Sequence, residues 1–124
     1  MDNGLRILDS GREMIKSIYG IIFPDYEKFG LQSQIRRAAV SVNLNVTEGN
    51  GRQTSKDFIH FCYMAKGSLE EVKECLYICN ELKFIDKYVL EVLITAKIEP
   101  VMKQLHSLIR YLKSKVQNPE SNQK

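Results

Sequence analysis

The chain has 124 residues, of which 44% are hydrophobic and 27% charged, as in an ordinary soluble domain. Its formal net charge of +3 is too small to identify a nucleic-acid-binding protein by itself. No apolar run approaches the about 20 residues that cross a bilayer, which argues against a membrane partner.

The first predicted helix spans about Leu5 to Phe23 and ends before Pro24, because proline supplies no backbone N–H and restricts the residue before it. Gly11 lies on its inner face, where we expect a neighbouring helix to approach closely. Four apolar residues define that face: Leu8, Ile15, Ile18 and Ile22.

The second predicted helix runs from about Leu31 to Glu48, and Gly49 and Gly51 supply its stop. At 100° per residue five apolar residues form one stripe: Ile35, Ala38, Ala39, Val42 and Val46. An alternation typical of a strand competes with this helix over Val40, Val42, Leu44 and Val46. We favour the helix, because no second strand candidate exists to satisfy the backbone of the first.

The third predicted helix begins near Thr54, which forms a capping-box pattern with Asp57. Its apolar seam has the 4-3 spacing of a helix packed against a neighbour: Phe58, Cys62, Ala65, Leu69, Val72, Leu76 and Cys79. The seam crosses Gly67 without losing phase, so we expect one long helix. The glycine costs about 1 kcal/mol relative to alanine, and close approach of a partner there would offset that cost.

The fourth predicted helix spans about Lys87 to Lys115, with Asp86 as its cap. Pro100 removes one hydrogen bond inside it, so we expect a kink. The seam keeps its spacing across the proline: Ile94, Ile98, Val101, Leu105, Leu108 and Leu112. We therefore predict an all-α, up-down-up-down four-helix bundle over residues 1–116 and a disordered polar tail over residues 117–124.

The segment from Ser33 to Arg52 resembles the signature of the 23S rRNA intervening-sequence protein family, small bacterial four-helix-bundle proteins. The family pattern reads roughly SQIRRAAxSxxxNxAEGxGR, followed by GSLxE. The matching residues are Ser33 to Ser41, Asn45, Glu48-Gly49, Gly51-Arg52, Gly67-Ser68-Leu69 and Glu71. The family usually has Ile-Pro where this chain has Val42-Asn43, so we expect a straighter second helix.

The apolar surface exceeds what one seam per helix requires, which predicts self-association. Additional apolar residues lie outside the seams on three helices, and Val40 and Leu44 point away from the core stripe of theirs: Ile7, Met14, Ile21, Val40, Leu44, Ile59, Phe61, Tyr63, Met64, Cys75, Tyr77, Ile78 and Leu82. Members of the resembled family look like ring-shaped homopentamers, so the resemblance implies a pentamer.

No catalytic motif is present in the sequence, so we predict neither an enzyme nor a cofactor. The acidic N-terminal segment lacks the apolar core of a secretory signal, and three unpaired cysteines indicate reduced thiols, which predicts a cytoplasmic protein. Cys75 and Cys79 lie one turn apart without a third ligand, so core packing is favoured over metal binding. We expect His60 to be a structural histidine and not a base.

A polar stripe on the second helix has two interpretations. It predicts a structural network at the corner between the second and third helices, formed by Arg37, Ser41, Asn45, Glu48 and Arg52. A ligand site is the alternative, because an arginine fork suits a phosphate as well as it suits a carboxylate.

Two basic clusters are candidates for contact with nucleic-acid phosphates. The first contains Arg36, Arg37, Arg52 and Lys56, and the second has 3-4-3 spacing on the last helix: Lys103, His106, Arg110 and Lys113. Residues 87–124 carry seven basic and three acidic side chains. A solvated face near a helix C-terminus explains the second cluster equally well.

Two hypotheses of function follow. In the first, the protein is a homo-oligomer that binds structured RNA or DNA through phosphates, without reading bases. The resemblance to a family associated with ribosomal RNA genes favours a nucleic-acid partner. In the second, the protein is a protein-interaction scaffold whose arginines are structural.

Overall fold

Four helical rods form the fold in a computed structural model that describes residues 3–118, with side chains from Arg6 onward. The first three rods are α1 (Asn3–Tyr19), α2 (Leu31–Asn50) and α3 (Ser55–Glu81). The fourth comprises α4 (Lys87–Leu93), the π-helical segment η2 (Ile94–Ile98) and α5 (Glu99–Gln117). A short 3-10 helix, η1 (Asp25–Glu27), lies between α1 and α2. Residues 3–118 contain no strand, so the predicted all-α class is confirmed.

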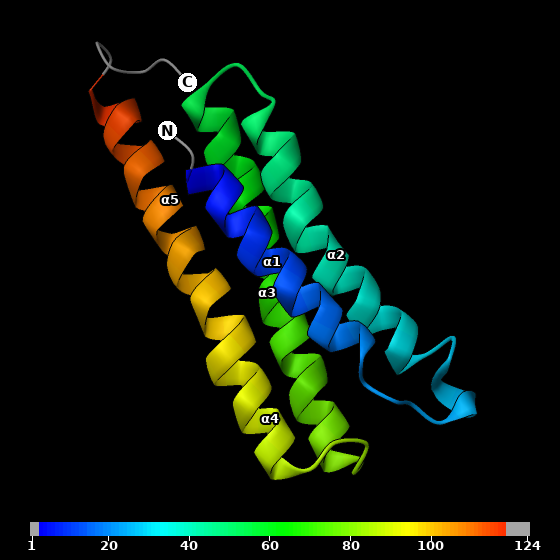
Figure 1. Cartoon of the computed structure of the whole chain (residues 1–124). Coiled ribbons are helices and arrows are strands. Elements are labelled where there is room, and N and C mark those ends of the chain that lie inside the picture. Colours follow the sequence, from blue (N-terminus) through cyan, green and yellow to red (C-terminus); the bar gives the residue numbers. More distant parts are fainter. Residues whose placement is uncertain (1–2, 119–124) are drawn as a thin grey trace.

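The rods pack side by side, and successive rods run in opposite directions (Figure 1). Helix α2 packs against α1 and α3, while α5 packs against α3 and α1, which closes the bundle around one core. The connections are short enough to keep sequential rods adjacent. The predicted up-down-up-down arrangement is therefore confirmed.

The core contains the three apolar stripes that the sequence predicted on the second, third and fourth rods. Every seam residue of α3 from Phe58 to Cys79 is buried, and so is every predicted seam residue of the last rod from Ile94 to Leu112. The α2 stripe from Ile35 to Val46 is buried as well. Because these residues recur at helical spacing, each rod presents one continuous apolar face to the core.

The predicted inner face of the first helix is partly wrong. The observed core residues are spaced 4-3-4, with Gly11 among them: Ile7, Gly11, Met14 and Ile18. Leu8 and Ile15 are only partly buried, and Ile22 is 88% exposed. Helix α1 ends at Tyr19, earlier than predicted, because the chain turns at Gly20 and continues without helix to Pro24. Ile21 therefore enters the core from outside the helix.

Close approach of a helix at Gly11 is confirmed. Asn43 of α2 reaches past this glycine and donates a hydrogen bond from Nδ2 to the carbonyl oxygen of Leu8, at 3.0 Å. A Cβ at position 11 would collide with the side-chain amide of Asn43. The glycine thus makes room for the bond that joins α1 to α2.

Helix α3 begins and continues as predicted. The Thr54 hydroxyl accepts a hydrogen bond from the backbone N–H of Asp57 at 3.1 Å, which caps the helix. The helix then runs unbroken across Gly67. Gly67 faces open space: apart from the adjacent helix backbone and its two chain neighbours, no described atom lies within 4 Å of where its Cβ would lie. The close helix approach expected at this glycine is therefore absent within residues 3–118.

Pro100 does not interrupt the last rod. The residues before it widen into the π-helical segment η2, in which the N–H of Glu99 bonds to the carbonyl oxygen of Ile94. Widening is one way to accommodate a ring that would otherwise meet the preceding turn. Asp86 caps the start of the rod, accepting the N–H of Val89 at 2.8 Å.

Several apolar residues predicted to be surplus belong to the core of the single chain. Ile7, Met14, Ile21 and Cys75 are buried, so they are not available to a neighbouring subunit. His60, predicted to be structural, is exposed, and its ring forms a T-shaped pair with the Phe61 ring, with 5.5 Å between the centroids. No helix within the described residues has the length and hydropathy to traverse a membrane.

The predicted tail begins at Gln117, but Gln117 still belongs to α5. The rest of the predicted tail beyond Asn118 lies outside the described residues.

Candidate nucleic-acid interface

The polar residues of α2 mainly pair with α3 or with each other. Ser41 and Ser68 share a hydrogen bond between their hydroxyl oxygens at 2.9 Å, and Asn45 Nδ2 donates to Ser41 Oγ at 3.0 Å. Gln34 donates a hydrogen bond to the carboxylate of Glu71. All five residues belong to the sequence signature described above, so much of that signature fixes the α2/α3 contact.

The predicted five-residue network is divided into three separate groups. Ser41 and Asn45 form one group. Glu48 and Arg52 form the second, an ion pair of 2.9 Å one turn apart. Arg37 bonds to Ser33 Oγ at 3.0 Å and does not reach Glu48, because the two lie three turns apart on α2.

The first basic cluster does not gather on one surface. Arg36 lies on α2 and Arg52 lies two residues beyond its end at Asn50, so the helix from Arg36 to Asn50 already separates them by about 21 Å at about 1.5 Å per residue. The Arg36 guanidinium covers the Tyr19 ring at 4.5 Å and donates to the Tyr19 carbonyl oxygen at 3.3 Å, at the end of α1. Arg52 lies over the Phe61 ring at 4.8 Å. Arg36 is therefore half-buried at a helix end, and Arg52 engages Phe61 although it is exposed, as Arg37 and Lys56 are.

The second basic cluster lines a groove between α3 and α5. The groove has a volume of about 460 Å³, and His106, Arg110 and Lys113 of α5 contribute to it. Lys66 adds a fourth basic side chain from α3. Because α3 and α5 are antiparallel, the first half of α3 meets the last half of α5. Among the described residues that line the groove, none carries a carboxylate.

An aromatic ring lies among these cations. Tyr63 of α3 lines the groove with 44% of its surface exposed, and Lys113 Nζ lies 5.3 Å from the ring centroid. Ile109, which is nearly buried, supplies an apolar patch of the wall. Basic and aromatic side chains therefore occur together at the mouth of one concave surface.

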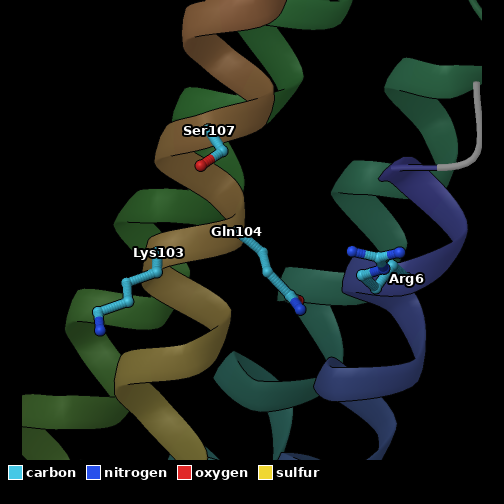
Figure 2. Close-up of a pocket in the computed structure, with 4 residues that line it drawn as sticks. All are labelled: Arg6, Lys103, Gln104 and Ser107. Atoms are coloured by element: carbon cyan, nitrogen blue, oxygen red, sulfur yellow. The ribbon is translucent and has the colours of Figure 1, made fainter.

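Lys103, the remaining member of the second cluster, lines a different hollow. This hollow of about 200 Å³ lies between α1 and α5 and includes Arg6, Gln104 and Ser107. Figure 2 shows Gln104 extending from α5 toward Arg6, whereas Lys103 points away from Arg6. The two cations thus diverge, and the hollow is a weaker candidate for phosphate binding than the groove.

Sequence reasoning missed Lys66, Tyr63 and Arg6 as candidate residues. Tyr63 and Lys66 are three residues apart, so they share a face of α3, and that periodicity was readable. Their proximity to Arg110 and Lys113 was not, because it depends on which flank of α3 the last rod covers.

The three cysteines within the described chain are buried. Burial raises the pKa of the Cys62 thiol to about 12 and that of the Cys79 thiol to about 11. Burial, with a smaller contribution from Glu71 and Glu74, also raises the pKa of Cys75. No group of three or more His, Cys, Asp or Glu side chains in residues 3–118 is placed to hold a metal ion.

Comparison with known proteins bears on the fold and the family. A crystal structure of a protein of unknown function from the S23 ribosomal protein family of Bacteroides thetaiotaomicron superposes with a TM-score of 0.74. The alignment covers 83% of this chain and 97% of the other, at 23% sequence identity, and so supports the fold alone. Comparison with curated proteins gives no match. The sequence model of the 23S rRNA-intervening sequence proteins matches residues 3–107, which include the whole α2/α3 signature, and the chain therefore belongs to this family.

Proposed function

We propose that this protein is a non-enzymatic, homo-oligomeric helical bundle of the cytoplasm that binds structured RNA or DNA through phosphate contacts. The observation that carries the proposal is the α3/α5 groove, where Lys66, Arg110 and Lys113 converge without a lining carboxylate among the described residues. The family name refers to an intervening sequence of 23S rRNA, which agrees with a nucleic-acid partner.

Arg36 of α2 and Arg52, which follows the end of α2, contribute little to this proposed interface. Arg36 and Arg52 each engage an aromatic ring and a hydrogen-bonding or ionic partner in their own chain. Releasing either side chain to a phosphate would break those contacts. The groove cations form no ion pair within the described residues, so their charge remains available to an anionic ligand.

A modest charge per chain is enough if several chains act together. Each subunit of an oligomer would present its own groove, and phosphates of one nucleic acid would contact several grooves at once. The second contact is then intramolecular, so affinity rises without additional charge on each subunit. Binding of this kind releases counterions and weakens as salt concentration rises.

A salt series tests the proposal. The affinity of the wild-type protein for a labelled RNA hairpin and a DNA duplex is measured by fluorescence anisotropy from about 25 to 300 mM salt. The double variant Arg110→Gln/Lys113→Gln removes two groove cations. We expect weaker binding and a salt slope shallower by about one unit for each lost contact.

A matched variant separates the groove from net charge. Lys28→Gln/Lys83→Gln removes the same charge from exposed positions in the connections that flank α2 and α4. We expect this variant to keep most of the wild-type affinity. Undetectable binding at low salt contradicts the proposal, and so does equal weakening by the two double variants.

Self-association is proposed as well, with five subunits as the family resemblance implies. The support is the set of apolar side chains that remain exposed on α2, on α3 and directly after the end of α3: Leu44, Met64, Ile78 and Leu82. Light scattering coupled to size exclusion should give a mass several times the 14.3 kDa of one chain. Met64→Glu should reduce that mass, and a single-chain mass for the wild type at high concentration refutes self-association.

The scaffold hypothesis retains one supporting observation. In the connection between α1 and α2, Ile22 is 88% and Phe29 is 90% exposed, and Tyr26 is also exposed. Exposed apolar groups so close together are typical of a surface that another protein covers. The salt series decides between the two functions, because a scaffold without a nucleic-acid site binds neither probe at low salt.

A further inference from the structure

The shape of the α3/α5 groove restricts the kind of nucleic acid that it can hold. Directly packed helices have axes about 8–10 Å apart, so the groove between them is narrow. A DNA duplex accepts a protein helix into its own major groove, which is about 12 Å wide. The duplex is therefore the concave partner in such contacts, and it could touch only the rims of this groove.

The lining of the groove suits a nucleotide whose base is unpaired. Tyr63 offers an exposed ring, and every base has a flat face that can stack on it. Lys113 Nζ lies over one face of that ring, 5.3 Å from its centroid, so a base that stacks on the other face would bring its own phosphate near a cation. Ile109 provides apolar contact beside the ring.

Two further cations extend this arrangement along the groove. Lys66 lies one turn after Tyr63 on α3, and Arg110 lies one turn before Lys113 on α5. Cations therefore stand on both walls of the groove, with the aromatic ring among them. The volume of about 460 Å³ falls within the range of roughly 300–1,000 Å³ that is usual for ligand sites.

We propose that the α3/α5 groove binds unpaired nucleotides, with a base stacked on Tyr63 and the adjoining phosphates on Lys66, Arg110 and Lys113. This inference rests on the proposed function and names its ligand as single-stranded segments, such as the loops and ends of a structured RNA. Stacking is tolerant of sequence, so no particular base is selected.

The test compares a labelled 20-nucleotide oligouridine strand with an RNA duplex of equal length at one low salt concentration. Four proteins are titrated by fluorescence anisotropy: wild type, Tyr63→Ala, Tyr63→Phe and Tyr88→Ala. We expect wild type to prefer the single strand. Tyr63→Ala should weaken single-strand binding about five- to 150-fold and affect duplex binding little.

The other variants separate loss of the aromatic ring from loss of a hydroxyl group or of any tyrosine. Tyr63→Phe retains the ring and should bind the strand as wild type does. Tyr88 of α4 is 74% exposed and lies outside the groove, so Tyr88→Ala should also bind normally. Thermal melting of each variant verifies that it is folded.

Two negative results have different meanings. Equal affinity of Tyr63→Ala and wild type for the single strand overturns the stacking inference, while continued salt-dependent binding leaves the proposed function standing. A wild-type preference for duplex also overturns the inference. Failure of the wild type to bind either probe overturns both proposals.

Discussion

Ser41 on α2 and Ser68 on α3 share a hydrogen bond, with 2.9 Å between their hydroxyl oxygens. Each serine belongs to a different half of the sequence signature, and the chain between them forms the corner where α2 meets α3. Asn45 donates a second hydrogen bond to Ser41 Oγ. The two halves of the signature thus recur together because they form one packed contact, which explains them without invoking a ligand.

Removing this hydrogen bond should lower stability, and the effects of the Ser41 and Ser68 substitutions should depend on each other. Ser41→Ala and Ser68→Ala should each reduce the free energy of unfolding by about 1 kcal/mol, because each leaves a partly buried hydroxyl without its partner. The double variant should lose less than the sum, with a coupling of about 0.5 kcal/mol or more. Urea denaturation of the wild type, the two single variants and the double variant gives the four free energies of this double-mutant cycle. Strictly additive losses would show that the hydrogen bond contributes nothing to stability.

The same substitution at two glycines should have opposite effects. A Cβ at Gly49 would lie 2.8 Å from Phe58 Cδ1 and 2.8 Å from Phe61 Cβ, so Gly49→Ala should destabilise the protein by about 1–3 kcal/mol. Gly67 faces open space, so Gly67→Ala should stabilise it by about 1 kcal/mol through helix propensity. Denaturant midpoints measure both changes. A loss of stability in Gly67→Ala would indicate that a second chain packs at this position.

Arg36 and Arg37 are neighbours in sequence but should differ in their contribution to stability. Arg36→Ala should cost about 1–2 kcal/mol, because the side chain covers the Tyr19 ring and binds the carbonyl oxygen at the end of α1. Arg37→Ala should change stability by less than about 0.5 kcal/mol, since its guanidinium is exposed and bonds only to Ser33 among the contacts found. Thermal and urea melts compare the two. Unchanged stability in Arg36→Ala would show that Arg36 has no structural role, so its side chain could bind a ligand at no cost to the fold.

The three cysteines should be unreactive in the folded protein. Burial raises the pKa of all three thiols, Cys62, Cys75 and Cys79, above the ordinary value of 9.0. A thiol-specific disulfide reagent at pH 8 should therefore modify them far more slowly in the native state than in guanidinium. Rapid labelling of a native cysteine would show that the core around it opens readily.

The same raised pKa values predict a dependence of stability on pH. Between the ordinary pKa of 9.0 and the raised values of about 11 for Cys79 and about 12 for Cys62, the unfolded chain releases thiol protons that the folded chain retains. The thiol contribution to stability is complete below pH 9 and falls as the pH rises above it. Urea melts at pH 8 and pH 10, with Cys62→Ala as a control, measure this contribution.

The fold could be predicted from sequence where periodicity alone decides it. The α3 seam from Phe58 to Cys79 and the last seam from Ile94 to Leu112 are long, so their phase is unambiguous. Helix α1 is short and carries two neighbouring apolar stripes, so periodicity could not decide between Leu8 and Ile7 as core residues. Gly11 determines which stripe of α1 faces the core, because Gly11 must face Asn43 for α1 and α2 to approach each other.

The candidate site was only partly predictable because it is assembled from two helices. Arg110 and Lys113 were recognisable by their spacing on one helix. Lys66 joins them through tertiary packing of α3 against α5, which no local pattern encodes. Conversely, Arg36 and Arg52 looked available to phosphate until the structure showed Tyr19 and Phe61 beneath their guanidinium groups.

The most direct test of the proposed interface is to map by cross-linking where nucleic acid binds on the protein. RNA containing 4-thiouridine is bound to the wild-type protein, irradiated, and the cross-linked peptides are identified by mass spectrometry. Cross-links should concentrate in the two groove walls, at Tyr63 to Lys66 and at His106 to Gln117. Cross-links confined to residues 36–56, which include α2, the following connection and the start of α3, would contradict binding in the α3/α5 groove, and so would the absence of cross-links at low salt.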